Sequence, residues 1–433
     1  MREVTCQAAE GSTLDNLNSR RNGPDPTRTF LITGVLRMSS LRFIAVSYTL
    51  FLASIGLSFA EIFAVNGLFA FIEACFQTPT GVFADRYGRA KAVKIGTFVL
   101  ACGSLAYYFA NDLVSALLIE GMVGLGLAFV NGADEAWLKA RLKERQGKSD
   151  LTAIFGRYET ISGIVSIVFG VIGGYVAKDN RRLAWLPASG IAFISLFFVM
   201  LWMKDPPNGH AKEKVWRATG QAFRQILACA RQMTKEPPLL WAAAAGCGSS
   251  LLLPAFFFWV IFFKARVGDA WLPLLWIPFF GSKALGAVIV ARSVTLGRLS
   301  SKARMLCLVA CYALGVPCLF VMGGSSGWLW PAVAFTVLEI AFGIFTPLFN
   351  GFVQNQITDD KRRATFKSMN SMCIGLGNTL VTVVMVFKTH GQKADDTLIT
   401  LAWRQMGWAM LAVSILLFLI RPRHVVELPA QSS

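Results

Sequence analysis

Residues 81–91 read Gly-Val-Phe-Ala-Asp-Arg-Tyr-Gly-Arg-Ala-Lys and stand between two long apolar runs. Its two glycines, Gly81 and Gly88, allow a tight reversal and a close approach of two helices. Asp85 can neutralise Arg86 or Arg89 and can face the positive N-terminal end of a neighbouring helix. Charges that only set membrane topology would explain the basic residues, but neither Asp85 nor the glycine spacing. The stretch is therefore predicted to be a structured loop between two membrane-crossing helices.

The composition around this loop indicates an integral membrane protein. Of 433 residues, 55% are hydrophobic and only 15% are charged, whereas soluble domains carry roughly 25% charged residues. A spanning helix needs about 20 mostly apolar residues, and twelve runs meet that need. They cover residues 30–54, 59–82, 92–110, 113–138, 151–177, 183–203, 239–263, 270–291, 305–323, 328–351, 369–387 and 398–420.

The formal net charge of +17 is explained by membrane topology rather than by a nucleic-acid partner. With both termini in the cytoplasm, the inner segments carry 30 of the 42 Lys and Arg residues, and the outer loops carry 8. An excess of basic residues on the cytoplasmic side is the usual bias of multi-pass proteins. We therefore expect a multi-pass protein with both termini cytoplasmic.

The apolar runs fall into two sets of six. We predict a disordered cytoplasmic tail over 1–29, a six-helix bundle over 30–203, a second bundle over 239–420 and a cytoplasmic tail over 421–433. The linker over 204–238 has apolar residues at helical spacing and basic residues on the other faces, which predicts an amphipathic helix on the membrane surface. Span four ends in Asn131-Gly132 and span ten in Asn350-Gly351, an echo that suggests duplication. The predicted fold is all-α, with twelve transmembrane helices in two pseudo-symmetric six-helix bundles.

The loop at 81–91 resembles the signature of the major facilitator superfamily, G-x-x-x-D-R-x-G-R-[KR], at every position except Ala90, with Lys91 one residue late. Residues 131–136 and 362–368 resemble further patterns of that family's bacterial members. The resemblance covers about residues 30 to 420 and implies a monomer with the family's fold. It also implies a cavity lined by spans one, four, seven and ten. It assigns a conformational gating loop that latches the two halves on the cytoplasmic side when the cavity faces outward. The gating residues are Gly81, Asp85, Arg86, Gly88 and Arg89.

Two departures weaken an assignment to drug–proton antiport. Family antiporters often carry an Arg in span four, and here the matching position is Glu120. They also often carry G-P-x-x-G-G in span five, whereas residues 169–174 keep the glycine pair and lack Gly-Pro. The resemblance is therefore to an efflux-like bacterial branch without all of its antiporter features.

Ionisable residues inside the spans are functional candidates, because a buried charge in the bilayer costs several kcal/mol unless it is paired or faces water. We hypothesise that Glu339 carries a coupling proton, with Glu73 or Glu120, and that Arg42 pairs with it or with an anionic group of the substrate. The alternative is a set of static ion pairs, which we favour for Arg157 with Glu159 or Asp134. The predicted residues for proton coupling or the substrate cavity are Arg42, Glu73, Glu120, Lys283 and Glu339, with Asn131 and Asn350 as polar contacts.

Span seven ends in an aromatic run at residues 256–259. Aromatic side chains could line a cavity for an aromatic or amphipathic substrate. We expect most of this run to face lipid instead, because aromatic belts are common at membrane interfaces.

Three functions are compatible with these features. The leading one is proton-coupled efflux of a drug-like or secondary-metabolite compound across a bacterial inner membrane. The alternatives are an importer of a nutrient or metabolite, and a membrane sensor or membrane-embedded enzyme. The chain has no HExxH or P-loop and no paired Cys/His spacing, so we predict no enzymatic, metal or cofactor site. The expected partners are a small molecule, protons and the lipid bilayer.

Overall fold

The computed structural model describes residues 24–144, 151–205, 215–295, 300–357, 363–393 and 395–422, and these residues form helices and connecting turns without strands. The helices before α10 make up the N-terminal half. They are α2 (Pro26–Phe43), α3 (Tyr48–Ser54), α4 (Phe59–Tyr87), α5 (Arg89–Tyr107), α6 (Leu113–Val130), α7 (Ala133–Glu144), α8 (Leu151–Val176), η1 (Arg181–Ala184) and α9 (Trp185–Trp202).

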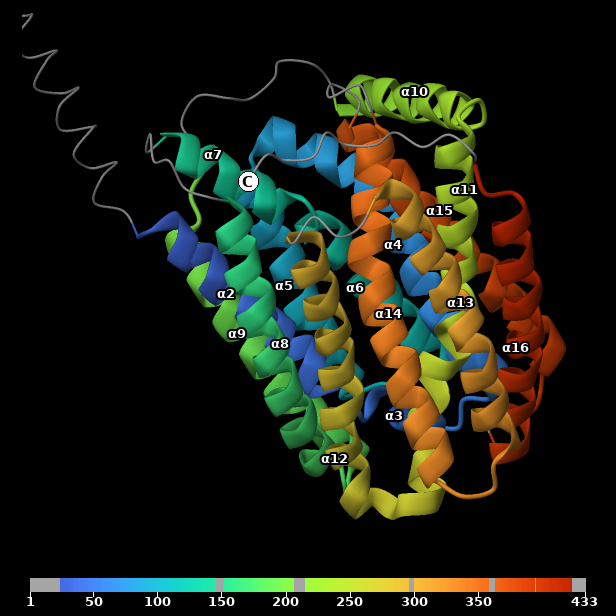
Figure 1. Ribbon diagram of the computed structural model, residues 1–433. Helices are drawn as coiled ribbons and strands as arrows, with labels where there is room; N and C mark the ends of the chain where they lie inside the picture. The colour runs from blue at the N-terminus through green and yellow to red at the C-terminus, as the bar shows by residue number, and fades with distance from the viewer. Residues whose placement is uncertain are drawn as a thin grey trace, which may run out of the picture.

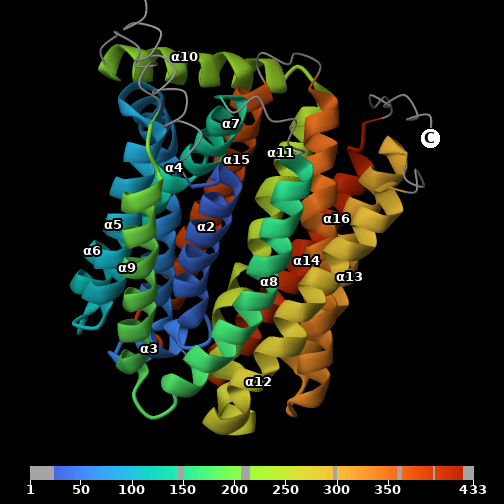
Figure 2. The same ribbon diagram turned by 90° about the vertical axis from the view of Figure 1, so that its left-hand side faces the viewer.

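The linker contains α10 (Val215–Met233), which lies across one end of the bundle (Figure 1). The C-terminal half follows it. Its helices are α11 (Pro237–Gly248), η2 (Ser249–Leu252), α12 (Leu253–Thr295), α13 (Ser301–Gly324), α14 (Leu329–Gln356), α15 (Arg363–Thr389) and α16 (Asp396–Leu419). We call the opposite end, which carries α3 and the turn in the middle of α12, the far end (Figure 2).

The spans agree with the predicted twelve. Nine helical runs among the described residues are long and apolar enough to cross a membrane, and α2 with α3 adds a tenth that is bent by 42°. One of the nine, Pro237–Ser293, has 57 residues and is broken at Gly268, where φ is 72°. It therefore supplies two spans, and α15 supplies a shorter apolar helix over Cys373–Thr389. Exposed apolar side chains such as Leu118 and Phe387 give these helices surfaces that suit contact with lipid.

Several helix boundaries differ from the predicted ones for local reasons. Span one is interrupted by turns at residues 44–47, so α2 and α3 are separate helices. The fourth span was predicted to continue to 138, but α6 ends at Val130, because Asn131 is extended and Gly132 has a φ of 82°. The matching Asn350-Gly351 lies inside α14, so the two halves differ at this echo.

Polar caps define the helix ends near the far end. The Ser58 hydroxyl and the Glu61 side chain form a capping box at the start of α4. Asp112 does the same for α6, where the backbone N–H of Ser115 donates to its carboxylate over 2.8 Å. That hydrogen bond lowers the pKa of the exposed Asp112 carboxyl.

Small residues bring neighbouring helices into close contact within each half. A Cβ on Gly96 of α5 would lie 2.5 Å from the carbonyl oxygen of Gly126 on α6. A Cβ on Gly343 of α14 would lie 2.0 Å from the carbonyl oxygen of Lys283 on α12. Such approaches are typical of membrane helices, which gain stability from close packing rather than from leaving water. The second contact also brings Lys283 next to α14.

The two halves meet mainly between α4 and α15 and between α8 and α12. Close contacts lie toward the far end. The ring of Phe59 stacks on that of Phe258 with centroids 4.0 Å apart, and the Phe59 backbone N–H donates to the Gln392 carbonyl over 3.1 Å. On the other seam, the Trp276 Nε1–H donates to the Ser166 carbonyl over 3.0 Å.

The prediction for the aromatic run at 256–259 was wrong. Phe258 and Trp259 are buried, and Phe256 and Phe257 pack against the same core cluster. The physical reason is that the partners of this run, such as Phe59 and Phe63, come from the other half of the chain. Those partners are not visible in the run's own sequence.

Candidate functional site

A cavity of about 400 Å³ lies between the two halves. Ten of the twenty residues that line it are aromatic. These are Tyr48, Phe69, Tyr107, Trp185, Phe256, Phe257, Trp259, Trp276, Phe280 and Phe342. We call this space the central cavity. Four of the five ionisable residues predicted for proton coupling or substrate binding line it, namely Arg42, Glu120, Lys283 and Glu339.

Two cations enter the central cavity from opposite halves. Arg42 comes from α2, and its Cζ lies 5.2 Å from the centroid of the Phe280 ring. Lys283 comes from α12, and its Nζ lies 4.8 Å from the centroid of the Phe342 ring. Both distances are within the range of a cation–π interaction. The aromatic lining therefore holds each cation at the wall of the cavity.

Glu339 of α14 interacts electrostatically with both cations. It lies one helical turn before Gly343, whose missing side chain lets α14 approach Lys283. Among the described residues, no carboxylate oxygen lies within 4.0 Å of Arg42 or Lys283, so Glu339 attracts both cations without a closed ion pair, while the two cations repel each other. Glu159 of α8, which sequence reasoning had placed in a structural pair, also interacts with Arg42 and Lys283.

Glu120 occupies a different part of the central cavity. It is only 7% exposed, and its carboxylate accepts a short hydrogen bond from the Tyr107 hydroxyl. The Tyr107 ring stacks on Trp185 with centroids 4.2 Å apart. Glu120 is thus held in place by a partner of its own, unlike Glu339.

A second cavity of about 760 Å³ lies toward the α10 end and is lined by residues of α4, α7 and α15. It contains Glu73 and Asn131, and the Asn131 amide donates to the Glu73 carboxylate over 2.7 Å. The structure therefore separates Glu73 from the other predicted carboxylates. Asn350 is exposed on α14 and lines neither of these two cavities.

The predicted gating loop borders the second cavity. Arg89 Nη2 forms an ion pair with Asp85 at 3.1 Å, and Arg89 Nη1 donates to the Ala136 carbonyl over 2.9 Å. The Arg86 guanidinium lies 5.7 Å from the centroid of the Tyr87 ring. These contacts stay within the N-terminal half.

The prediction of a loop over residues 81–91 was wrong, because α4 continues to Tyr87 and α5 begins at Arg89. Only Gly88 breaks the helix, with a φ of 118°. Beyond it, the backbone N–H groups of Ala90 and Lys91 donate to the Asp205 carboxylate over 2.7 and 3.1 Å. The sequence predicts that Asp85 faces a helix N-terminus, but Asp205, three residues after the end of α9, takes that place at α5. The close helix approach expected at Gly81 is also absent, because a Cβ there would meet no atom within 4 Å.

The expected pairing of Arg157 with Asp134 is not formed, because Asp134 pairs with Arg37 of α2 at 2.5 Å. Arg157 itself is exposed on α8. Burial explains the choice of partner, since an enclosed carboxylate requires a charge partner that is also enclosed. The Arg37 side chain is only 8% exposed.

Several site residues were not found from the sequence. They include Asp205 at the loop and Trp276 and Phe280 in the central cavity. Residues 276, 280 and 283 follow the i, i+4, i+7 spacing of one helix face. That spacing, ending on a lysine, was a signal that could have revealed the cavity-lining face of α12.

Comparison with known proteins decides the family. The family model for the Major Facilitator Superfamily matches residues 30–382. The chain belongs to this superfamily. As a superfamily member with membrane-spanning helices, it is a multi-pass membrane protein.

The superfamily relatives found by sequence match only part of the chain. Two uncharacterized MFS-type transporters of Methanocaldococcus jannaschii are 29% identical over 147 residues and 27% identical over 129 residues. The matches cover 32% and 30% of this chain and 38% and 31% of those proteins. An uncharacterized transporter of Buchnera aphidicola is 30% identical over 140 residues, covering 31% of this chain and 34% of that protein. The chain thus spans about a third of the length of the relatives it matches.

Solved structures match this chain along most of its length. The nucleoside transporter NupG aligns with a TM-score of 0.70 and 13% identity, covering 93% of this chain and 100% of that one. The peptide transporter POT in complex with sulfate aligns with a TM-score of 0.72 and 14% identity, covering 92% and 95%. At these identities the likeness shows the fold alone.

Proposed function

We propose that this superfamily member is a proton-coupled secondary transporter that exports a drug-like or secondary-metabolite compound across the cytoplasmic membrane. The observation that carries the proposal is the meeting of Arg42, Lys283 and Glu339 at one cavity between the halves. In a transporter of this kind the two halves rock about a central site, which opens to each side in turn. A charge that changes at that site alters the attraction between the halves and can therefore shift the equilibrium between the two openings.

Glu339 is the proposed proton carrier. It lines the cavity and faces Lys283 on α12 and Arg42 on α2, with Glu159 on α8 interacting with the same cations. Protonation would leave both cations without the attraction of this carboxylate. Glu120 is held by Tyr107, and Glu73 by Asn131 in the other cavity, so each has a local role that does not require a proton to move.

The loop over residues 81–91 is the proposed gate on the α10 side, which we assign to the cytoplasm. Here the loop borders an open cavity, and Asp85 and Arg89 bond each other. Closing the α10 side would bring the loop toward α15 and allow its charged groups to exchange partners. The proposed unit is a monomer in a bacterial inner membrane.

Export rests on the resemblance of the loop to efflux-like members, while one observation favours import as a second candidate. Glu339 interacts with two cations that, among the residues the structure describes, have no carboxylate oxygen within 4.0 Å. A proton on Glu339 would therefore strengthen the binding of an anion, and such positive linkage is the requirement of proton symport.

The proton role is tested with Glu339→Gln in proteoliposomes. A panel of a hydrophobic cation, a nucleoside, a dipeptide and an aromatic carboxylate, all radiolabelled, is offered under an imposed pH gradient. For the compound that the wild type moves, we expect gradient-driven flux in the variant to fall to that of empty vesicles, whereas exchange without a gradient persists. Glu73→Gln and Glu120→Gln should keep gradient-driven flux. Unchanged pH-dependent uptake by Glu339→Gln would contradict the assignment of Glu339 as the proton carrier.

The direction is tested by comparing the same panel in inverted and right-side-out vesicles. Accumulation in inverted vesicles supports export, because their interior corresponds to the outside of the cell. Accumulation only in right-side-out vesicles with an inward proton gradient would replace export by symport.

A further inference from the structure

Arg42 and Lys283 differ from the enclosed arginines of this protein in having no carboxylate at contact distance. Arg37 pairs with Asp134 at 2.5 Å, Arg266 pairs with Asp396 at 2.6 Å, and Arg181 pairs with Asp269. In the part of the chain that the structure describes, neither cavity cation has an ion pair within 4.0 Å. The Nε of Arg42 is moreover buried without a hydrogen-bond partner. A buried donor in this condition is costly unless a ligand or water satisfies it.

The aromatic walls of the central cavity are the second observation that bears on the charge of its ligand. Half of the lining residues are aromatic, and Phe280 and Phe342 already have cations over their rings. A cationic ligand would find these two faces occupied and would meet two like charges. Its carboxylate partners would be Glu339, which attracts both protein cations, and Glu120, which is bonded to Tyr107. Like-charge juxtaposition of this kind disfavours a cation.

We propose that the central cavity binds an organic anion, in which one carboxylate lies between Arg42 and Lys283 and a flat aromatic body lies against the tryptophans and phenylalanines. The guanidinium can satisfy its open Nε–H on the carboxylate, and the ammonium supplies further donors. The cavity volume of about 400 Å³ limits the compound to a small molecule. This inference rests on the proposed function only in taking the cavity as the substrate site.

The test compares three ligands that share one aromatic body, namely 2-naphthoate, 2-naphthamide and 2-naphthylmethylammonium. Their binding to the full-length protein in lipid nanodiscs is followed by quenching of tryptophan fluorescence, since Trp185, Trp259 and Trp276 line the cavity. Because a hydrogen-bonded charge contact is worth about 1.5–3 kcal/mol, naphthoate should bind about tenfold to hundredfold more tightly than the amide. The ammonium compound should bind more weakly than the amide.

Variants of the two cations test which side chains bind the carboxylate of naphthoate. Lys283→Gln and Arg42→Gln should each lose at least about tenfold in naphthoate affinity while keeping the affinity of the wild type for naphthamide, which also shows that they fold. Lys283→Arg keeps the positive charge and should keep the naphthoate preference. Arg292→Gln, an exposed change on the same helix, is the matched control and should behave as wild type.

The proposal is overturned if the ammonium compound binds as tightly as naphthoate, if Lys283→Gln retains the naphthoate preference, or if naphthoate shows no saturable binding. Failure of the anion site can be told apart from failure of the proposed transport. If a proton gradient drives a cation across the membrane of the proteoliposomes, proton-coupled transport is supported and the anion site is contradicted. If naphthoate binds through Lys283 but no gradient moves it, the anion site is supported and proton-coupled transport is contradicted.

Discussion

Gly81 and Gly88 both lie in the segment 81–91, but only Gly88 has a backbone conformation that favours glycine. Gly88 has a φ of 118°, a conformation that side chains with a Cβ rarely adopt, and an added Cβ would lie 2.1 Å from the Asp205 carboxylate. Gly81 is inside α4 with open space around it. In this conformation, only Gly88 requires the absence of a side chain.

We therefore expect Gly88→Ala to destabilise the protein, by roughly 2 kcal/mol or more, because the left-handed backbone and the loss of the Asp205 cap both cost free energy. Gly81→Ala is the control and should be neutral or slightly stabilising, since alanine favours the helix interior. Thermal unfolding midpoints of the two purified variants measure the difference. Equal midpoints would contradict the role assigned to Gly88.

At the scale of elements, α12 determines much of the cavity. The break at Gly268 lets its second part return along the bundle, and the close contact at Gly343 holds that part against α14. Residues Trp276, Phe280 and Lys283 then lie on the face that lines the cavity. The part of α12 after Gly268 thus supplies two aromatic side chains and one cation to the same site.

The linker helix α10 packs against α4 of one half and α15 of the other. Its Ala230 and Met233 contact the main core cluster, whereas Phe223 and Leu227 remain exposed. Arg224 and Arg231 are exposed at other positions around the helix. This arrangement supports the proposal that α10 rests on the membrane surface while it tethers the halves.

Spin labels at two positions of α10 test that proposal. In a variant without native cysteines, a label at Leu227→Cys should be relaxed mainly by oxygen, which concentrates in lipid. A label at Arg224→Cys should be relaxed mainly by a water-soluble nickel complex. Equal exposure of both labels to the nickel complex would show that α10 does not lie on the membrane.

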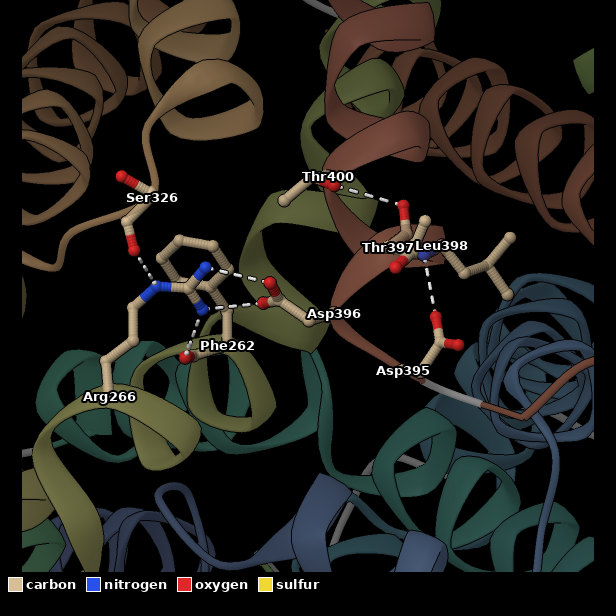
Figure 3. Close-up of polar contacts among 8 residues, drawn as sticks. All are labelled: Phe262, Arg266, Ser326, Asp395, Asp396, Thr397, Leu398 and Thr400. Carbon is tan, nitrogen blue, oxygen red and sulfur yellow. Dashed lines mark hydrogen bonds and ion pairs between the residues drawn. The ribbon is translucent and has the colours of Figure 1, made fainter.

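At the scale of the whole molecule, ion pairs near the far end have two different roles. Arg181 of the N-terminal half pairs with Asp269 of α12, and Lys264 lies 3.7 Å from the same carboxylate. Arg266 instead binds Asp396 through two contacts of 2.6 and 2.8 Å and donates to the Ser326 carbonyl over 3.2 Å (Figure 3). The second network joins α12, α16 and residues before α14, all within the C-terminal half.

Removing the pair between halves should open the far end. Asp269→Asn takes away the partner of both Arg181 and Lys264, and the loss of about 1 kcal/mol would raise the open population about fivefold. We expect faster labelling of Thr49→Cys, a cavity residue, by a membrane-impermeant maleimide added on the far side. Asp396→Asn is the matched control, because its pair lies within one half, and it should leave the labelling rate unchanged. The same increase in both variants would show that the far end is not closed by Asp269.

The family signature and the span pattern could be predicted because both depend on local sequence. Apolar runs long enough to cross a bilayer indicate helices wherever their partners lie, and Gly88 signals its turn without knowledge of the fold. Partners distant in sequence could not be predicted. Arg37 rather than Arg157 pairs with Asp134, and Asp205 rather than Asp85 caps α5.

The sequence alone determined that residues 81–91 carry the signature of the superfamily, since hydrophobic length, charge bias and glycine spacing are properties of the chain itself. Only the tertiary structure decided which ionisable residues share a cavity. It brought Arg42, Lys283 and Glu339 together from α2, α12 and α14 and left Glu73 in another space. The physical reason is that the packing of whole helices, here through contacts such as Gly343 on Lys283, sets which helix faces meet.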